Sequence, residues 1–194
     1  AWLQTPARQN PQIYANTRVG DWGYDVAIVD LEHGQIDDSE MAGIFSEVRG
    51  TATAAGARLR RSESRYASYA LDMGAELIIG PMIETAEMAG SLVAACMYPS
   101  SQGMGKRGCG WGPGNNNGMG LRDYVKNWND WVAVVAQIET ATAIRNIDEI
   151  MEVDGICGAI IGPFDLSLSF QAEGEGTVGD FDSDVMRSAL NSYL

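Results

Sequence analysis

One group of ionisable side chains stands out because it interrupts an apolar segment. The run Val26–Leu31 is otherwise apolar, yet Asp30 lies within it, and Glu32 and His33 follow it directly. A charged side chain is costly to bury without a partner. His33 is the only histidine of the chain, and imidazole is the side chain whose ordinary pKa lies closest to neutrality. We therefore interpret His33 as a general acid or base; the alternative is an ordinary loop histidine beside two helix-capping carboxylates.

Two further carboxylates end apolar runs later in the chain. Glu139 follows the run Val132–Ile138, and Asp165 follows the run Gly158–Gly162 about one βα unit later. Because the carboxyl ends of adjacent parallel strands meet at one edge of a sheet, both should project toward one place. Two carboxylates without a second histidine suit a hard cation such as Mg²⁺ or Mn²⁺. The alternatives are helix capping by both residues, or Glu84 as a ligand in place of Glu139.

The positions of the lysines and arginines limit the kinds of catalysis that the chain can perform. The only lysines are Lys106 and Lys126, and neither lies in a predicted strand, so Schiff-base chemistry at a buried lysine is not indicated. Arg58 ends the run Ala54–Leu59, and strand alternation places Arg58 and Arg60 on one face. One of these arginines can therefore point toward the same edge as the carboxylates, whereas a solvated basic edge is the alternative.

The elements that must position these residues alternate along the chain. Short apolar runs typical of buried parallel strands span Ala1–Gln4, Val26–Leu31, Ala54–Leu59, Leu77–Met82, Val132–Ile138 and Gly158–Gly162. Amphipathic stretches typical of helices span Asp38–Glu47, Ser64–Met73, Thr85–Cys96, Thr140–Met151 and Ser183–Leu194. Alternation of this kind predicts an α/β protein with a parallel sheet.

Two strand-to-helix junctions carry nearly the same four residues. These are Ile83–Ala86 and Ile138–Ala141, and each offers a threonine, Thr85 or Thr140, as the N-cap of the following helix. The long segment Tyr98–Gly120 is rich in Gly and Asn and has no periodicity, which indicates a loop. In a barrel such a loop is expected on the active-site face.

The number of predicted strands leaves two architectures open. The 194 residues, 45% of them hydrophobic, suffice for one sizeable core, and we predict a single domain over residues 1–194. A complete (β/α)8 barrel takes about 250 residues. Six strands therefore correspond either to a barrel without its last two βα units or to an open α/β sheet.

Composition excludes some partners and favours one compartment. With 13 Lys+Arg against 26 Asp+Glu, the formal net charge is −13, which disfavours nucleic acid and anionic membranes as partners. The three cysteines show neither Cys-x-x-Cys spacing nor an even count, so no disulfide framework or zinc ribbon is indicated. We expect no targeting or membrane-spanning segment and a cytoplasmic location.

Taken together, the motifs resemble those of the HpcH/HpaI aldolase family of class II pyruvate aldolases, which includes citrate-lyase-like members. The resemblance covers most of the chain and rests on Asp30–Gly34, Arg58, Leu71–Ala75, Pro81–Thr85, Tyr98–Pro99, Arg107–Gly108, Gln137–Thr140 and Gly162–Ser167. It implies a (β/α)8 TIM barrel of the phosphoenolpyruvate/pyruvate type, here incomplete at the C-terminus, and a homo-oligomer, commonly a hexamer.

The resemblance also implies roles for the residues singled out above. Glu139 and Asp165 are implied as ligands of Mg²⁺, Mn²⁺ or Co²⁺. His33 is implied as the acid/base, supported by Asp72, and Arg58 as the group that faces the developing enolate.

The same resemblance implies a substrate-binding set. Gln137 is expected near a metal-bound water, and Gly162, Pro163 and Phe164 begin a helix whose N-terminal amides would receive the carboxylate of a small 2-oxo acid.

The implied reaction is cleavage of a 4-hydroxy-2-oxo acid to pyruvate and an aldehyde through a metal-stabilised pyruvate enolate. Some motifs also resemble a family member that decarboxylates oxaloacetate and adds the enolate to a pyrone, so oxaloacetate decarboxylation is an alternative. A second alternative is a non-catalytic, truncated barrel that acts as a binding subunit.

Overall fold

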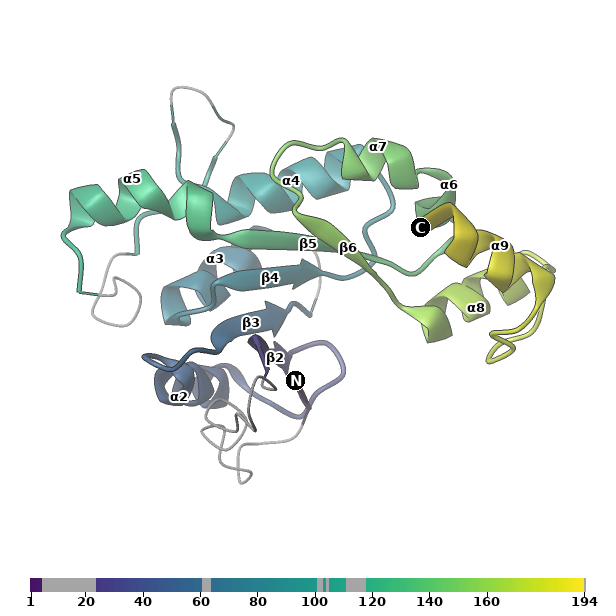
Figure 1. The fold of residues 1–194 in the computed structure, drawn as a ribbon, viewed down its shortest axis with the longest axis horizontal. Coiled ribbons are helices and arrows are strands. Elements are labelled where there is room, and N and C mark those ends of the chain that lie inside the picture. Colours follow the sequence, from purple (N-terminus) through teal and green to yellow (C-terminus); the bar gives the residue numbers. More distant parts are fainter. Residues whose placement is uncertain (5–23, 61–63, 101–102, 104, 111–117, 194) are drawn as a thin grey trace.

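The sheet of the protein contains all the predicted strands. The computed structural model describes residues 1–4, 24–60, 64–100, 103, 105–110 and 118–193. The strands are β1 Trp2–Leu3, β2 Val26–Asp30, β3 Ala54–Arg58, β4 Leu77–Gly80, β5 Ala133–Ile138 and β6 Gly158–Ile161. Every neighbouring pair is parallel, and the spatial order equals the sequence order. The sheet curls into a half-barrel (Figure 1), so the barrel interpretation is confirmed.

Helices connect the successive strands from β2 onward. They are α2 Asp38–Val48, α3 Ser64–Met73, α4 Ala86–Cys96, α5 Leu121–Trp131, α6 Ala141–Arg145, α7 Ile147–Met151, α8 Pro163–Ala172 and α9 Asp184–Tyr193. The predicted caps are confirmed, because the Thr85 hydroxyl accepts from the N–H of Met88 and the Thr140 hydroxyl from the N–H of Ala143. No helix within the described ranges is long and apolar enough to span a bilayer.

The prediction of one continuous helix over Thr140–Met151 is wrong. The helix is broken at Asn146, where α6 ends and α7 begins. The side-chain amide of Asn146 donates to the carbonyl of Glu84 at 2.8 Å. That tertiary contact between the segments after the neighbouring strands β4 and β5 is not visible in a hydrophobic pattern. The prediction also lacked α5, whose buried face rests on two residues, Tyr124 and Trp128.

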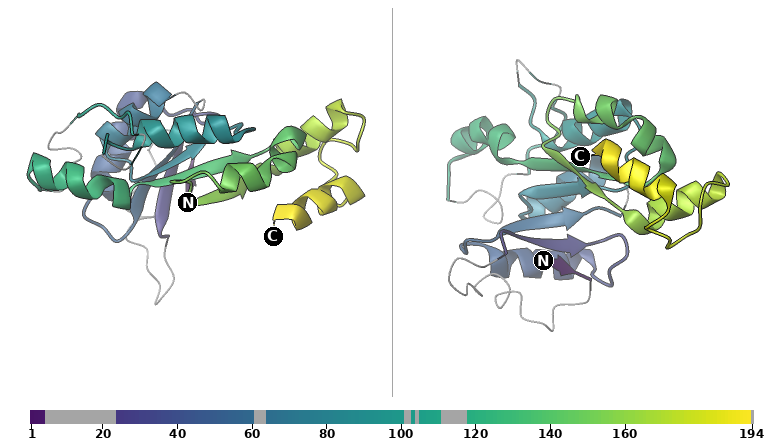
Figure 2. Two further views of the ribbon diagram at one scale, coloured as in Figure 1. Left: turned by 90° about the horizontal axis from the view of Figure 1, so that it is seen from above. Right: turned by 45° about the vertical axis from the view of Figure 1, so that its right-hand side comes forward.

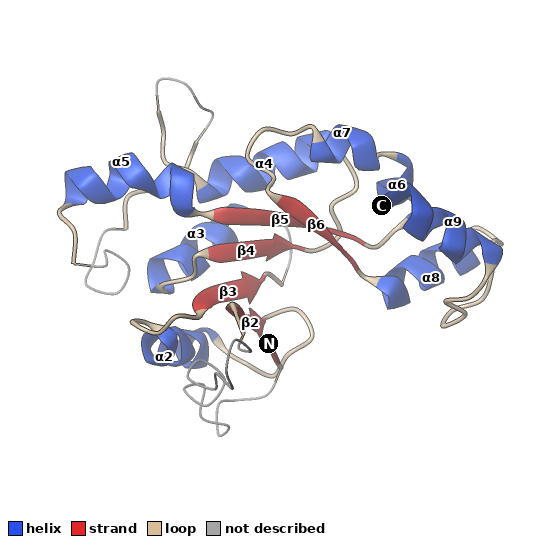
Figure 3. Cartoon of the chain, in the orientation of Figure 1, coloured by secondary structure: helices blue, strands red, loops and turns tan. Residues whose placement is uncertain are grey.

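The helices are distributed unevenly around the sheet. The strand arrows run toward the side where α8 and α9 lie, and α5 lies at the opposite end, near the start of β5 (Figure 3). Seen from above, α8 and α9 stand well away from the layer formed by α3 and α4 (Figure 2). The carboxyl ends of the strands therefore lie on the side of the sheet edge that faces α8 and α9.

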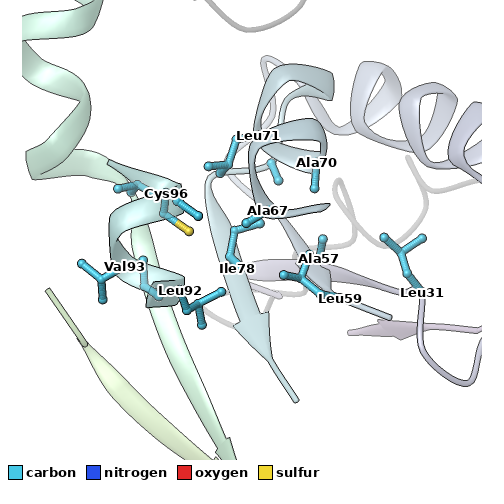
Figure 4. Close-up of a cluster of buried hydrophobic side chains, with 14 of the residues drawn as sticks. Leu31, Ala57, Leu59, Ala67, Ala70, Leu71, Ile78, Leu92, Val93 and Cys96 are labelled. Carbon is cyan, nitrogen blue, oxygen red and sulfur yellow. The ribbon is translucent and has the colours of Figure 1, made fainter. Parts of the chain in front are cut away.

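The main core lies between the sheet and the α3–α4 layer. Leu71 from α3 and Leu92 from α4 are fully buried, and both lie beside Ile78 of β4 (Figure 4). Alternate residues of a strand face opposite sides, so each strand buries one set of side chains here and directs the next set into the half-barrel. Burial of this core fixes the strands whose ends carry the candidate site.

Candidate active site

A cavity of about 400 Å³ lies at the carboxyl ends of the strands. Its lining comes from strands β1, β3, β5 and β6, from the loops after β1 and β2, and from the start of α8. The lining residues are Trp2, Gln4, His33, Arg58, Gln137, Ile160, Ile161, Gly162, Pro163, Phe164 and Asp165. The structure thus brings together most of the predicted site residues. Glu139 is not itself a lining residue but is hydrogen-bonded to Gln137, which is, whereas Asp72 pairs with Arg107 outside the cavity.

Arg58 is a buried cation held by two carboxylates. Its Nε donates to Oδ1 of Asp30 at 2.8 Å, and Nη2 donates to Oδ2 of the same residue. Its Nη1 lies 3.3 Å from a carboxylate oxygen of Glu32, and its guanidinium lies over the Trp2 ring at 4.9 Å. A planar guanidinium suits such two-point pairing, and the fixed geometry aims its charge into the cavity.

Asp30 is the residue that orients this arrangement. It is fully buried, and besides Arg58 it accepts from Gln4 Nε2 at 2.8 Å and from the backbone N–H groups of Glu32 and His33. Burial alone raises the pKa of Asp30, but the hydrogen bonds from Arg58, Gln4 and His33 outweigh it, so the pKa is lowered. Asp30 therefore stays ionised and fixes both Arg58 and the turn that carries His33.

His33 lies at the mouth of the cavity. Its side chain is 59% exposed, and Nε2 is 3.8 Å from Glu32 Oε2. Burial raises the pKa of Glu32; Arg58 opposes that shift, and the charge of Glu139 adds to it. An exposed imidazole beside a carboxylate can exchange a proton with a ligand in the cavity.

Glu139 is a buried carboxylate with both oxygens held. It is 1% exposed; Oε1 accepts from the backbone N–H of Met82 at 2.7 Å, and Oε2 accepts from Gln137 Nε2. Burial raises the pKa of Glu139; the Met82 and Gln137 hydrogen bonds oppose the shift, and the charge of Asp165 adds to it. Glu139 and Asp165 are thus close enough to repel each other.

The residues present fit a divalent cation with few protein ligands. No group of three or more His, Cys, Asp or Glu side chains suited to a metal occurs in the part of the chain that the structure describes. Mg²⁺ commonly binds through one or two carboxylates and takes its other ligands from water and substrate. Oε1 of Gln137 is buried without a hydrogen-bond partner. A cation between Glu139 and Asp165 would relieve their repulsion, and a water bound to it would supply Gln137 with a donor.

Gly162 is required where β6 passes into α8. A Cβ on Gly162 would lie 2.4 Å from Oε2 of Glu139 and 3.1 Å from Nε2 of Gln137. Pro163 occupies the first position of α8 and Asp165 its first turn, and Phe164 is 68% exposed. Because the amides of a first helical turn have no partner within their helix, this junction presents donors beside the cavity.

Asp72 lies away from His33 in this structure. Its carboxylate accepts from Arg107 Nη2 at 2.8 Å. Arg107 is buried between the Tyr98 and Trp128 rings, at 4.7 and 4.3 Å. The carboxylate that lies near His33 is Glu32 rather than Asp72. The expected support of His33 by Asp72 therefore stays a prediction.

Glu84, the alternative ligand, has a different partner. Its Oε1 accepts from the hydroxyl of Thr140 at 2.8 Å, whereas Glu139 is hydrogen-bonded to Gln137, which lines the cavity. Glu84 of the first junction motif is thus hydrogen-bonded to Thr140 of the second, so the two motifs do not supply two equivalent ligands. Glu139 remains the better candidate.

Sequence reasoning missed two contributors, Gln4 and Met82, and the role of a third, Asp30. Gln4 reaches Asp30 from β1 across the sheet, Asp30 pairs with Arg58 from the neighbouring strand, and Met82 donates its backbone N–H to Glu139. The only available signal was the charge of Asp30 inside an apolar run. The other two contacts depend on strand register and backbone conformation.

The fold and site together define a class: a (β/α)-barrel protein with its ionisable residues at the carboxyl ends of the strands, where barrel enzymes carry their active sites. The chain belongs to the HpcH/HpaI aldolase/citrate lyase family, whose sequence model matches residues 8–189. This finding confirms the resemblance seen in the motifs.

Named relatives of the chain are aldolases, which are carbon–carbon lyases. A hydroxypyruvate/pyruvate aldolase of Roseobacter denitrificans is 32% identical over 176 residues, covering 90% of this chain and 68% of the relative. A 4-hydroxy-2-oxovalerate aldolase of Novosphingobium aromaticivorans is 36% identical over 168 residues, covering 84% and 60%. A 2-keto-3-deoxy-L-rhamnonate aldolase of Escherichia coli K12 is 32% identical over 169 residues, covering 87% and 60%. The chain thus spans about two thirds of these relatives or less.

Solved structures show the same architecture. An HpcH/HpaI aldolase/citrate lyase family protein from Burkholderia cenocepacia has a TM-score of 0.83 at 27% identity and covers all of this chain and 72% of its own. Macrophomate synthase has a TM-score of 0.79 at 21% identity, with coverage of 100% and 65%. The second likeness concerns the fold alone.

Proposed function

We propose that this protein is a metal-dependent class II aldolase that cleaves 4-hydroxy-2-oxo acids to pyruvate and an aldehyde. The observation that carries the proposal is a cavity lined by Arg58, His33 and Asp165. Asp30 holds Arg58 there, and Glu139 lies beside the cavity, where it is hydrogen-bonded to the lining residue Gln137. A fixed cation, a proton acceptor and two carboxylates are the groups that this carbon–carbon cleavage requires.

Each of these residues has one task in the proposed reaction. His33 accepts the proton of the C4 hydroxyl, directly or through a water, as the C3–C4 bond breaks and the aldehyde leaves. The bonding electrons form the enolate of pyruvate, and the charge of Arg58 stabilises it without needing to reorganise. The proton taken up by His33 is then returned, directly or through the same water, to C3 of the enolate, which gives pyruvate and restores neutral His33.

The ends of the substrate are held by separate groups. The first-turn amides of α8, around Phe164 and Asp165, bind the substrate carboxylate. Glu139 and Asp165 would hold Mg²⁺, Mn²⁺ or Co²⁺, and the bound cation would supply Lewis-acid polarisation of the keto group. Gln137 accepts a hydrogen bond from a water in this cavity through its unpartnered Oε1.

The relatives support the substrate class. Their names refer to hydroxypyruvate and pyruvate, 4-hydroxy-2-oxovalerate and a 2-keto-3-deoxy sugar acid, all small 2-oxo acids. We extend this class to the present chain, as one domain over residues 1–194 and a homo-oligomer, by resemblance a hexamer. A cytoplasmic location, and the lack of nucleic-acid and membrane partners, belong to the same proposal.

The test measures pyruvate release from 4-hydroxy-2-oxoheptanedioate and from oxaloacetate. The protein is first treated with a chelator and then given Mg²⁺, Mn²⁺ or Co²⁺, with protein-free metal controls because metals decarboxylate oxaloacetate unaided. We expect release from the hydroxy acid that the chelator abolishes and the metal restores. Release from oxaloacetate alone would favour the decarboxylase. The absence of pyruvate release with every metal would favour the non-catalytic barrel.

A further inference from the structure

Met82 has an uncommon backbone conformation at the end of β4. Its φ is 54°, and every other positive φ among the residues that the structure describes belongs to a glycine. The left-handed region is unfavourable for a residue with a Cβ, because that atom approaches the following carbonyl. Such strain persists only where the surrounding structure imposes it, and it gathers at functional sites.

The side chain of Met82 does not account for this conformation, because it is 43% exposed. The backbone does, because the Met82 N–H donates to Oε1 of Glu139 at 2.7 Å. The next residue, Ile83, donates its N–H to the carbonyl of Gln137 at 3.3 Å. Two successive amides thus fasten the turn after β4 to the end of β5.

These contacts leave the Glu139 carboxylate with one orientation. Gln137 Nε2 donates to its second oxygen, and Gly162 lies so close that a Cβ there would be 2.8 Å from the Cβ of Glu139. A carboxylate has about four acceptor positions on its two oxygens. Donors from Met82 and Gln137 use one position on each oxygen, and the remaining positions stay available to a cation.

We propose that Met82 is a positioning residue: its left-handed backbone holds the N–H that orients Glu139 for the divalent cation. The inference rests on the proposed function, in which Glu139 is a metal ligand. It requires the conformation and the N–H of Met82 but not its side chain. Substitutions at this position should therefore rank by their tolerance of positive φ, not by their size.

The experiment measures Mn²⁺ affinity of the full chain from the electron paramagnetic resonance signal of free Mn²⁺, with and without pyruvate. Met82→Gly keeps the N–H and favours positive φ, so its affinity should stay close to that of the unaltered chain. Met82→Val is β-branched and strongly disfavours this region. We expect it to weaken Mn²⁺ binding by about tenfold or more, as loss of a group that supports a metal ligand does. Met82→Ala should fall between them.

Controls separate positioning from folding and from the proposed function. Met151→Val alters a comparably exposed methionine, 40% exposed on α7, and should bind Mn²⁺ normally. The melting temperature of each metal-free variant reports its folding. Equal affinity in Met82→Val and Met151→Val would overturn this inference alone, as would a loss in Met82→Gly as deep as in Met82→Val. Failure of the unaltered chain to bind Mn²⁺, or normal binding by Glu139→Gln, would overturn the metal assignment and this inference together.

Discussion

Single residues decide the electrostatics of the site, and Arg58 carries most of this effect. Arg58→Lys keeps the charge but loses the two-point pairing with Asp30. We expect kcat for pyruvate formation to fall by about a hundredfold, as it does when one donor to a developing oxyanion is lost. Steady-state kinetics on the hydroxy acid measures this.

Arg60→Lys is the matched control for Arg58→Lys. Arg60 pairs with Asp38 at 3.1 Å on the surface, where its side chain is 39% exposed, and its variant should keep normal kinetics. A rate for Arg58→Lys within a few-fold of that control would remove Arg58 from the proposed mechanism.

Ionised Asp30 should make the free energy of unfolding depend on pH in the acidic range. Its pKa is lowered in the folded state from an ordinary value of 3.8, so the unfolded chain binds more protons in the window between the two values. Its stabilising contribution is therefore complete above that window and is lost as pH falls through the lowered pKa. Asp30→Asn should lower the free energy of unfolding by about 3 kcal/mol at neutral pH, since it leaves Arg58 without its main partner.

Chemical denaturation at neutral pH and at about pH 3 measures this difference, which should shrink at the lower pH. Asp38→Asn, which weakens the exposed pair with Arg60, serves as the control and should cost less than about 1 kcal/mol. A penalty for Asp30→Asn that is the same at both pH values would contradict the assignment.

A site residue could be predicted from the sequence only where an ionisable side chain lies near the end of a predicted strand. Glu139, Asp165 and His33 are ionisable residues close behind the ends of apolar runs, so the sequence indicated them. Asp72 shows the limit, because its structural partner is Arg107 from a long loop. A pattern along the chain contains no information about that pairing.

At the scale of elements, the β6–α8 junction leaves no room for a side chain at Gly162. Gly162→Ala would place a Cβ against both Glu139 and Gln137. Crowding of this kind typically costs about 1–3 kcal/mol, and we expect that loss in the free energy of unfolding of the metal-free protein, together with weaker Mn²⁺ binding. Denaturant titration and the Mn²⁺ titration measure the two effects.

Gly43→Ala is the control for an added methyl group. Gly43 lies inside α2 with no heavy atom within 4 Å of the added Cβ, so alanine should stabilise the helix by about 0.5–1 kcal/mol. Equal stability of the two variants would show that the Gly162 junction can relax around the methyl group.

Strands were more predictable than helices for a physical reason. A buried parallel strand is apolar on both faces, so β2 and β5 stand out in the sequence to within a residue at each end. The helix pattern depends on which face is covered, and α5 buries only two of its large residues, Tyr124 and Trp128. The break between α6 and α7 coincides with the hydrogen bond from Asn146 to the carbonyl of Glu84, in the segment after the neighbouring strand β4. Local sequence contains no information about that contact.

At the scale of the whole molecule, the half-barrel leaves apolar surface uncovered. β6 pairs with β5 and with no other strand in the described part of the chain. Phe164, Leu168, Val178 and Phe181 are 38–68% exposed on α8 and the segment after it, and Phe164 and Phe181 stack edge to face at 5.1 Å. Exposed apolar groups gathered on neighbouring segments are typical of contact surfaces.

We therefore expect the protein to self-associate through this region. Light scattering after gel filtration should give a multiple of the 20.9 kDa chain mass, which is sixfold for the proposed hexamer. Leu168→Glu places a charge on α8, where the side chain is 50% exposed in the single chain, and should lower the measured mass because a charge is costly to bury without a partner. Met151→Glu adds the same charge on α7 and should leave the mass unchanged. A 20.9 kDa particle at every concentration would contradict self-association, and an unchanged mass in Leu168→Glu would place the contact elsewhere.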